Sequence, residues 1–164
     1  MAAVGLMMMA ACSTQKNTAK SRWWHAFNAR YNTYYNGSVA YIDGSLEKEN
    51  GNRDNFTEII PLYTVGNKNS RDLGKSNFDK AIEKCQKAIK LWKAWLLMGR
   101  AQFSKGDFDE AASTFSYMSR LYQTQPVIYG KARAWLAKCY LEEGWIYDAE
   151  DVIRNMQRDS IHWQ

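Results

Sequence analysis

The C-terminal half of the chain carries apolar residues at steps of three and four, which is the spacing of an amphipathic helix. The first such stripe begins near Asn77, which we expect to cap a helix, and it comprises Ala81, Ile82, Cys85, Ala88, Ile89 and Leu91. Further apolar stretches follow over 92–103, 108–121, 132–140 and 146–156. Gly106 lies between the stretches 92–103 and 108–121, and Gly144 lies between 132–140 and 146–156. Glycine permits the tight turn of a helical hairpin. The pattern therefore predicts an all-α fold.

An aromatic stripe indicates another helix in the N-terminal half. Its members share one broad face at helical spacing: Trp23, Trp24, Phe27, Tyr31, Tyr34 and Tyr35. The segment Glu47–Asn55 is charged and rich in Gly and Asn, so it predicts a loop. Pro61 biases the preceding residue toward an extended backbone. We therefore expect an aromatic helical region over residues 22–63 and a polar loop over 64–76.

The last part of the chain, residues 77–164, contains an internal repeat. Four positions of the first copy match positions 38 residues later, namely Gly106 with Gly144, Phe108 with Ile146, Ala111 with Ala149, and Phe115 with Ile153. A partial earlier copy places Ala81 opposite Ala111, at an offset of 30 residues. A repeat of this length indicates stacked supersecondary units.

The unit resembles the tetratricopeptide repeat, a helix-turn-helix of about 34 residues. The first-helix motif of this repeat is matched by Trp95, Met98-Gly99 and Phe103. Its turn motif is matched by Gly106-Asp107-Phe108-Asp109-Glu110-Ala111. In the second copy Leu136-Ala137 and Tyr140 match, while Arg133 replaces the Trp. The resemblance implies antiparallel helical hairpins stacked as a short solenoid. The residues expected to pack between helices or to form turns are Gly99, Gly106, Ala111, Ala137, Gly144 and Ala149.

Two repeat offsets depart from the usual length. The longer one predicts an extended loop around Gln123–Tyr129, with Pro126 inside it. The shorter one brings Ile89-Lys90-Leu91 directly against Trp92-Lys93-Ala94 without a turn residue. Either one long helix replaces the hairpin, or a segment is missing. We favour a deletion, because a hairpin needs a connection that reverses the chain.

The N-terminus differs in kind from the rest. Residues 1–11 carry no charge, and they end in small residues directly before Cys12. This pattern resembles the lipobox of bacterial lipoproteins, which implies a signal peptide over 1–11, a diacylglycerol on Cys12 and a polar tether over 12–21. The stretch before Cys12 has no Lys or Arg. An ordinary signal peptide, or a disordered terminus that happens to contain a Cys, stays an alternative.

The chain as a whole resembles a narrower family. Its marks are the lipobox, the Asn-rich aromatic stretch Phe27–Gly37, the stretch Asp54–Pro61 and the repeats. These are similar to the N-terminal part of the large repeat lipoproteins of Bacteroidetes in gliding motility and type IX secretion, the SprE/PorW type. That family usually has an insertion where Leu91 meets Trp92, and more repeats follow. The resemblance implies a protein-binding scaffold anchored to the outer membrane and facing the periplasm.

Composition and motifs give little support to other functions. The net charge of +5 is a mild excess without a dense basic patch, so no nucleic-acid partner is expected. His25 and His162 lie at opposite ends of the chain, and no catalytic or phosphate-binding motif appears. We therefore expect no enzyme activity, metal, cofactor or small-molecule substrate. Cys85 and Cys139 are expected to be buried thiols.

Seven tryptophans are a surplus for so short an array. Most should pack in the core, but some should be exposed and form a binding surface for proteins. The candidates for contact with a partner are Trp92, Trp95, Trp135 and Trp145. A carbohydrate-binding helical-repeat lipoprotein is the alternative, because exposed Trp also stacks on sugars. The chain shows no polar capping helix after Met156, so we also expect an apolar face there that self-associates.

Overall fold

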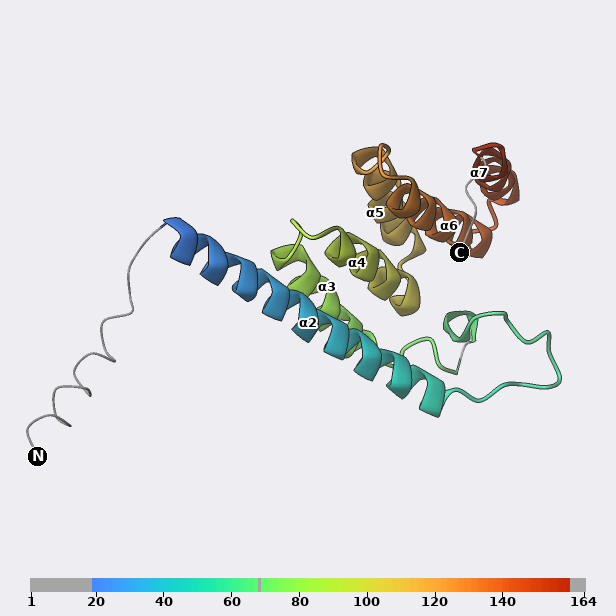
Figure 1. Ribbon diagram of the computed structural model, residues 1–164. Coiled ribbons are helices and arrows are strands. Elements are labelled where there is room, and N and C mark those ends of the chain that lie inside the picture. The colour runs from blue at the N-terminus through green and yellow to red at the C-terminus, as the bar shows by residue number, and fades with distance from the viewer. Residues whose placement is uncertain (1–18, 68, 160–164) are drawn as a thin grey trace, which may run out of the picture.

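The computed structural model describes residues 19–67 and 69–159, and all regular elements in these ranges are helices (Figure 1). Their bounds are α2 Ala19–Gly51, the 3-10 helix η2 Thr64–Gly66, α3 Lys75–Lys87, α4 Trp92–Lys105, α5 Phe108–Leu121, α6 Pro126–Glu142 and α7 Ile146–Arg158. The prediction of an all-α fold is confirmed for this part of the chain. Residues 1–18, 68 and 160–164 lie outside the description, so the predicted signal peptide, Cys12 and His162 are not placed.

Each helix packs chiefly against the next one along the chain. Contacts also join α4 to α2 and α4 to α6, so these three helices lie next to one another on one side. Helices α3, α5 and α7 alternate with them in the sequence. The direction reverses between α3 and α4, since an ion pair joins Asp79 at the start of α3 to Lys105 at the end of α4 (2.9 Å). It also reverses between α2 and α3, where Gly44 near the end of α2 faces Phe78 at the start of α3. The chain thus forms a zigzag with α2, α4 and α6 on one face.

The two glycine turns have the same geometry. Gly106 and Gly144 adopt left-handed φ angles of 95° and 78°. In both, the residue after the glycine donates its N–H to a carbonyl five residues earlier, from Asp107 to Gln102 (3.0 Å) and from Trp145 to Tyr140 (2.8 Å). These bonds satisfy carbonyls that the helix end leaves free. The repeated sequence therefore produces a repeated turn.

The connection between α3 and α4 removes the reason for which we favoured a deletion, namely that a hairpin could not close there. The chain reverses within Ala88–Leu91, without glycine or proline. Ala88 accepts a hydrogen bond from the N–H of Leu91 (2.9 Å), and Leu91 is extended at φ −94° and ψ 125°. Ile89 and Leu91 also pack against the core. The hairpin closes on these residues alone, so neither one long helix nor a missing segment is needed.

The start of α3 also differs from the prediction. Asn77 is not its cap, because the helix begins at Lys75 after Gly74, which has a φ of 75°. A Cβ on Gly74 would lie 2.4 Å from the carbonyl oxygen of Gly44 in α2. Only glycine fits this close approach, and it brings α3 against α2. The amide of Asn77 instead donates to the carboxylate of Glu47 (3.1 Å).

Helix α2 runs to Gly51, through part of the segment Glu47–Asn55 that we predicted as a loop. Lys48 explains the extension, because its side chain is only 3 % exposed and donates to the carbonyls of Ser104 (2.6 Å) and Arg71 (3.3 Å). These contacts outweigh the weak helix propensity of the Gly- and Asn-rich sequence. At its other end α2 begins at Ala19, so residues 19–21 belong to the helix and not to a tether.

Helix α6 begins at Pro126, inside the predicted loop Gln123–Tyr129. Proline suits the first turn of a helix, where its missing N–H leaves no bond unmade. The connection from α5 therefore covers only residues 122–125. The extra length of the second repeat lies in α6 itself, which has 17 residues where α4 has 14.

The core forms where small residues let the helices approach. Gly99 in α4 faces Phe115 in α5, and a Cβ on it would lie 2.5 Å from the ring. Ala111 and Ala149 are fully buried and Ala137 is nearly so. Cys85 and Cys139 are buried free thiols, and burial raises the pKa of each to about 12.

Lys48 gives the fold a testable pH dependence. Burial, with a smaller contribution from Lys75, lowers its pKa from 10.5 to about 8. Between these values the unfolded chain holds a proton that the folded chain releases, so this residue makes stability rise with pH. We expect Lys48→Met to lose that contribution. Urea denaturation measures the free energy of unfolding of the wild type and of the variant, and the wild-type value minus the variant value should be larger at about pH 9.5 than at about pH 7. An equal difference at both pH values would contradict the assignment.

Helix α7 leaves apolar side chains exposed at the end of the array. Ile146, Tyr147 and Ile153 are exposed, although Met156 is buried. We expect self-association through this face, seen in light scattering as a mass that rises with protein concentration. The variant Ile146→Ser/Ile153→Ser should remain monomeric. A wild-type protein that is monodisperse at every concentration would refute the prediction.

Candidate docking groove

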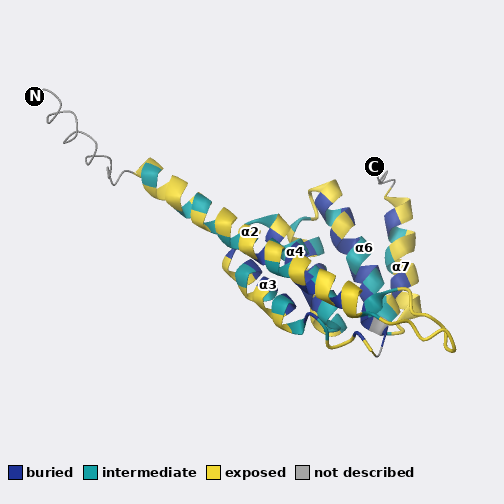
Figure 2. Ribbon diagram, turned by 90° about the horizontal axis from the view of Figure 1, so that it is seen from below, coloured by how far each residue is buried: buried dark blue, intermediate teal, exposed yellow. Residues whose placement is uncertain are grey.

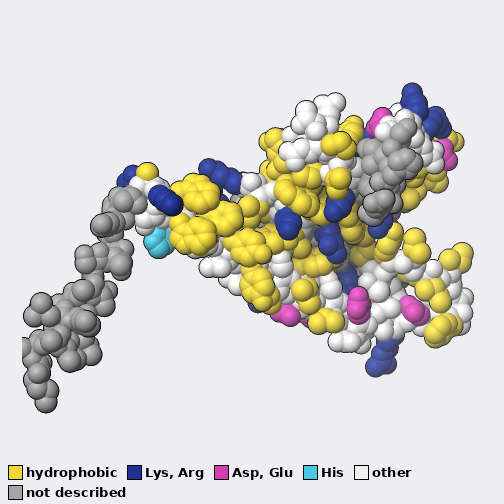
Figure 3. Space-filling view, viewed as in Figure 1, with side chains coloured by type: hydrophobic (Ala, Val, Ile, Leu, Met, Phe, Trp, Pro, Cys, Tyr) yellow, Lys and Arg dark blue, Asp and Glu magenta, His cyan; other side chains and the backbone are white. Residues whose placement is uncertain are grey.

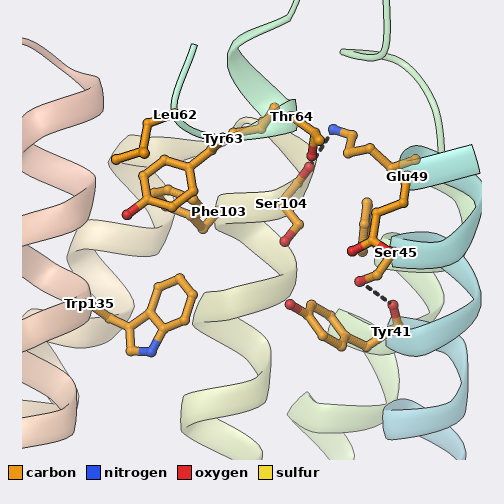
Figure 4. Close-up of a pocket in the computed structure, with 12 residues that line it drawn as sticks. Tyr41, Ser45, Glu49, Leu62, Tyr63, Thr64, Phe103, Ser104 and Trp135 are labelled. Atoms are coloured by element: carbon orange, nitrogen blue, oxygen red, sulfur yellow. Dashed lines mark hydrogen bonds between the residues drawn. The ribbon is translucent and has the colours of Figure 1, made fainter. Parts of the chain in front are cut away.

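Helices α2, α4 and α6 enclose a cavity of about 290 Å³ together with the loop before α3. Figure 4 shows Tyr41 from α2, Tyr63 from the loop and Trp135 from α6 around this space. Phe103 and Ser104 contribute from the end of α4. The wall is both aromatic and polar, and it is built from segments far apart in the sequence.

Cationic side chains lie over the aromatic rings of this wall. The guanidinium of Arg100 is 4.9 Å from the ring centre of Tyr41 and 5.4 Å from that of Trp135. The ammonium of Lys138 is 4.4 Å from the ring centre of Trp135 and 5.4 Å from that of Tyr63. Each pair gains roughly 0.5–2 kcal/mol, more when water is excluded. The cations thus hold α2, α4, α6 and the loop together.

A second cavity of about 230 Å³ continues along α2 and α4, and Tyr34, Trp92, Lys93 and Leu96 line it. Arg100 links the two spaces, since it lines the second cavity and contacts Tyr41 and Trp135 of the first. We call the combined surface the docking groove. It comprises Tyr34, Tyr41, Lys48, Glu49, Tyr63, Trp92, Lys93, Leu96, Arg100, Phe103, Lys131, Trp135 and Lys138.

Glu49 lines the first cavity, but the cations over the aromatic wall have no acidic partner in the described part of the chain. Among residues 19–67 and 69–159, no carboxylate forms an ion pair with Lys93, Arg100, Lys131 or Lys138. Helix α4 contains no Asp or Glu, and α6 contains only Glu142 at its end. The Nε of Arg100 is buried without a hydrogen-bond acceptor, a condition that normally costs free energy.

These features suit a ligand that brings both carboxylates and apolar side chains. Arg and Lys over aromatic faces can accept an anion without losing the cation–aromatic contact, and the rings offer apolar area. Figure 3 shows Lys and Arg side chains set among hydrophobic ones in the middle of the molecule. The described residues hold no group of three His, Cys, Asp or Glu side chains that could bind a metal ion.

The four candidate tryptophans lie in three different surroundings. Trp92 and Trp135 belong to the docking groove and are half-buried against the core. Trp95 packs on Tyr117 of α5 at 4.8 Å between ring centres. Trp145 is 49 % exposed at the turn before α7.

The residues that sequence reasoning missed are the cations, above all Arg100 and Lys138. A signal for them was present in the charge pattern, because the stretches that form α4 and α6 are basic and almost free of acids. Arg133 was noted only as a departure from the repeat motif. It is buried and bonds to the carboxylate of Asp159 and, at 3.4 Å, to the carbonyl of Val152, so it secures α7.

Comparison of the chain with models of known families, with curated proteins and with solved structures gave no match. The functional conclusion therefore depends on the residues and the geometry described above.

Proposed function

We propose that this protein is a lipid-anchored scaffold of the bacterial cell envelope that binds other proteins through the docking groove. Its helices form a short solenoid of the tetratricopeptide-repeat type. Its partners present acidic segments that also carry apolar or aromatic residues. The proposed setting is the periplasmic side of the outer membrane, in type IX secretion and gliding motility.

The matched turns support the repeat assignment. Gly106 and Gly144 occupy equal positions in two helix pairs and share the same hydrogen-bond pattern. Small residues lie where the helices cross, with Gly99 against Phe115 and buried Ala111 and Ala149 on the second helices. Stacking of such units leaves one long face free for a ligand.

The observation that carries the binding proposal is the unmatched charge of the docking groove. Cations without counter-charges in an aromatic-lined groove are a favourable surface for an acidic ligand. Lys105 and Arg133, which lie outside the groove, do have such counter-charges: Lys105 binds Asp79 and Asp107, and Arg133 binds Asp159.

The experiment is an affinity purification from solubilised envelope, with the partners identified by mass spectrometry. A matched bait carries Lys131→Glu/Lys138→Glu. We expect the wild type to recover secretion or motility components, and the variant to lose them. Recovery of none of these components, or equal recovery by both baits, would count against the proposal.

A second candidate function is carbohydrate binding, and one observation favours it. Trp145 lies next to Tyr140, at 5.6 Å between ring centres, beside a shallow cleft that Asp109, Ser116 and Arg120 also line. An aromatic platform next to polar side chains suits a sugar. Calorimetry with oligosaccharides separates the two functions: heat of binding that disappears in Trp145→Ala would support this candidate.

A further inference from the structure

We propose that the projecting N-terminal part of α2, residues 19–36, is a membrane-surface helix that lays its aromatic face on anionic lipid headgroups. We call this segment the aromatic arm. The inference goes beyond the proposed function, because it assigns a lipid-binding site to a surface that, apart from Tyr34, lies outside the docking groove. It also does not require a lipid on Cys12.

The aromatic arm extends beyond the other helices (Figure 1). Its described hydrogen bonds and ring contacts from Arg22 to Thr33 stay within α2. Figure 2 shows exposed and intermediate residues along this end, and the buried residues of α2 begin only at Gly37. Tyr34, near the end of the arm, packs against the core, so the exposed part of the arm is the stretch 22–33.

The exposed face of the arm is a ladder of rings. Neighbouring rings lie 5.6–6.4 Å apart along the helix, and large fractions of Trp23 (63 %), Trp24 (54 %), Tyr31 (53 %) and Tyr35 (61 %) are in contact with water. Figure 3 shows hydrophobic side chains gathered on the visible face of the helix end that projects from the molecule. So large an exposed aromatic area indicates a binding surface.

The unsupported helix also needs a partner for its own stability. Asn28, Asn32 and Asn36 are poor helix formers that lie together at a spacing of four residues. Most helical stability in proteins comes from packing of an amphipathic face and not from propensity. Adsorption with the aromatic face on a surface and the Asn face toward water would stabilise the helix.

The composition of the arm identifies lipid as the occupant. Residues 19–36 contain Trp, Phe and Tyr but no Leu, Ile, Val or Met, whereas helices that pair with other helices use branched aliphatic residues. Trp and Tyr favour the headgroup region of a membrane. Lys20, Arg22 and Arg30 supply positive charge, and the first acidic residue of the chain is Asp43, which suits anionic lipid.

The arm lies on the surface and does not cross it. No described helix is long and apolar enough to span a membrane. An amphipathic helix of low overall hydrophobicity with basic flanks is the kind that adsorbs in the interface. If Cys12 carries a lipid, only residues 13–18 separate that anchor from the arm, so both act on the same membrane.

The test uses full-length protein with Cys12→Ser, which removes lipid attachment, and vesicles of phosphatidylcholine with or without phosphatidylglycerol. We expect co-sedimentation with the anionic vesicles. The variant Trp23→Ser/Trp24→Ser/Tyr31→Ser should bind at least about tenfold more weakly. The control is Phe56→Ser/Ile59→Ser/Leu62→Ser, which removes apolar side chains that are 85 %, 98 % and 86 % exposed, and it should bind as the parent does.

A second measurement covers the case in which the Ser variant loses its helix. Lipids brominated in the acyl chains should quench the tryptophan fluorescence of the parent, and the quenching should fall in the conservative variant Trp23→Phe/Trp24→Phe. Equal vesicle binding by the Ser variant and the parent, or absence of quenching, would overturn the proposal. So would light scattering that shows dimers dissociated by the Ser substitutions, because that result would make a second copy the occupant.

Discussion

Truncating Phe115 to alanine is expected to lower the free energy of unfolding by about 3–5 kcal/mol, the range for a large buried aromatic residue. Its ring is fully buried, packs over Gly99 of α4 and stacks on Trp135 of α6 at 5.8 Å between ring centres. Phe115 therefore joins three helices of the array. Chemical denaturation measures the loss. The matched control Phe56→Ala removes the same side chain from an 85 % exposed site and should cost less than about 0.5 kcal/mol.

The partner of Phe115 allows a sharper test. Gly99→Ala would place a Cβ 2.5 Å from the ring, and overpacking of this kind costs about 1–3 kcal/mol. In the Phe115→Ala background the space is open, so the same substitution should become neutral or stabilising through the better helix propensity of alanine. Additive costs in the double-mutant cycle would show that the crossing of α4 and α5 does not depend on this pair.

Charge reversal in the docking groove is expected to abolish measurable binding of an acidic ligand. The probe is a fluorescent synthetic peptide of alternating Glu and Phe, followed by anisotropy. The variant Lys131→Glu/Lys138→Glu replaces attraction by repulsion at two sites, so we expect a loss of at least about a hundredfold. Binding by the wild type should also weaken as the salt concentration rises, because exposed charges are screened.

The control for net charge is Lys80→Glu/Lys90→Glu, which changes the total charge equally. Lys80 and Lys90 are exposed on α3 and in the turn after it, and neither is among the groove residues. This variant should keep most of the affinity. An equal loss in both double variants would mean that overall charge, and not the docking groove, controls binding.

The sequence was sufficient to predict the helices and the two glycine turns. Gly106 and Gly144 could be recognised as turn residues because a left-handed turn residue is almost always glycine. The matched alanines mark where helices cross. The turn over Ala88–Leu91 carries no such mark. It depends on the extended backbone of Leu91 and on burial of Ile89, which only the packed structure reveals.

The limits of α2 were mispredicted for a similar reason. Lys48 in a charged, Gly-rich stretch suggests a solvated loop, yet its ammonium binds two backbone carbonyls 23 and 56 residues away. Long-range contacts of this kind decide where a helix ends, and local propensity does not contain them.

The candidate site was predictable only in part. The tryptophans were chosen as candidate contact residues because the chain has more of them than its core should bury. Two of the four candidates lie in the docking groove. The basic bias of α4 and α6 was readable from the sequence. The position of Arg100 between Tyr41 and Trp135 was not, because it requires three helices to meet.

Photo-crosslinking in living cells tests most directly whether the docking groove holds a partner. A benzophenone amino acid replaces Lys93, which lines the groove, or Lys80, which is exposed on α3. We predict a defined crosslink to an acidic envelope protein from position 93, lost when Lys131→Glu/Lys138→Glu is added, and none from position 80. Crosslinks from position 80 alone, or a position-93 crosslink that survives the charge reversal, would contradict the account.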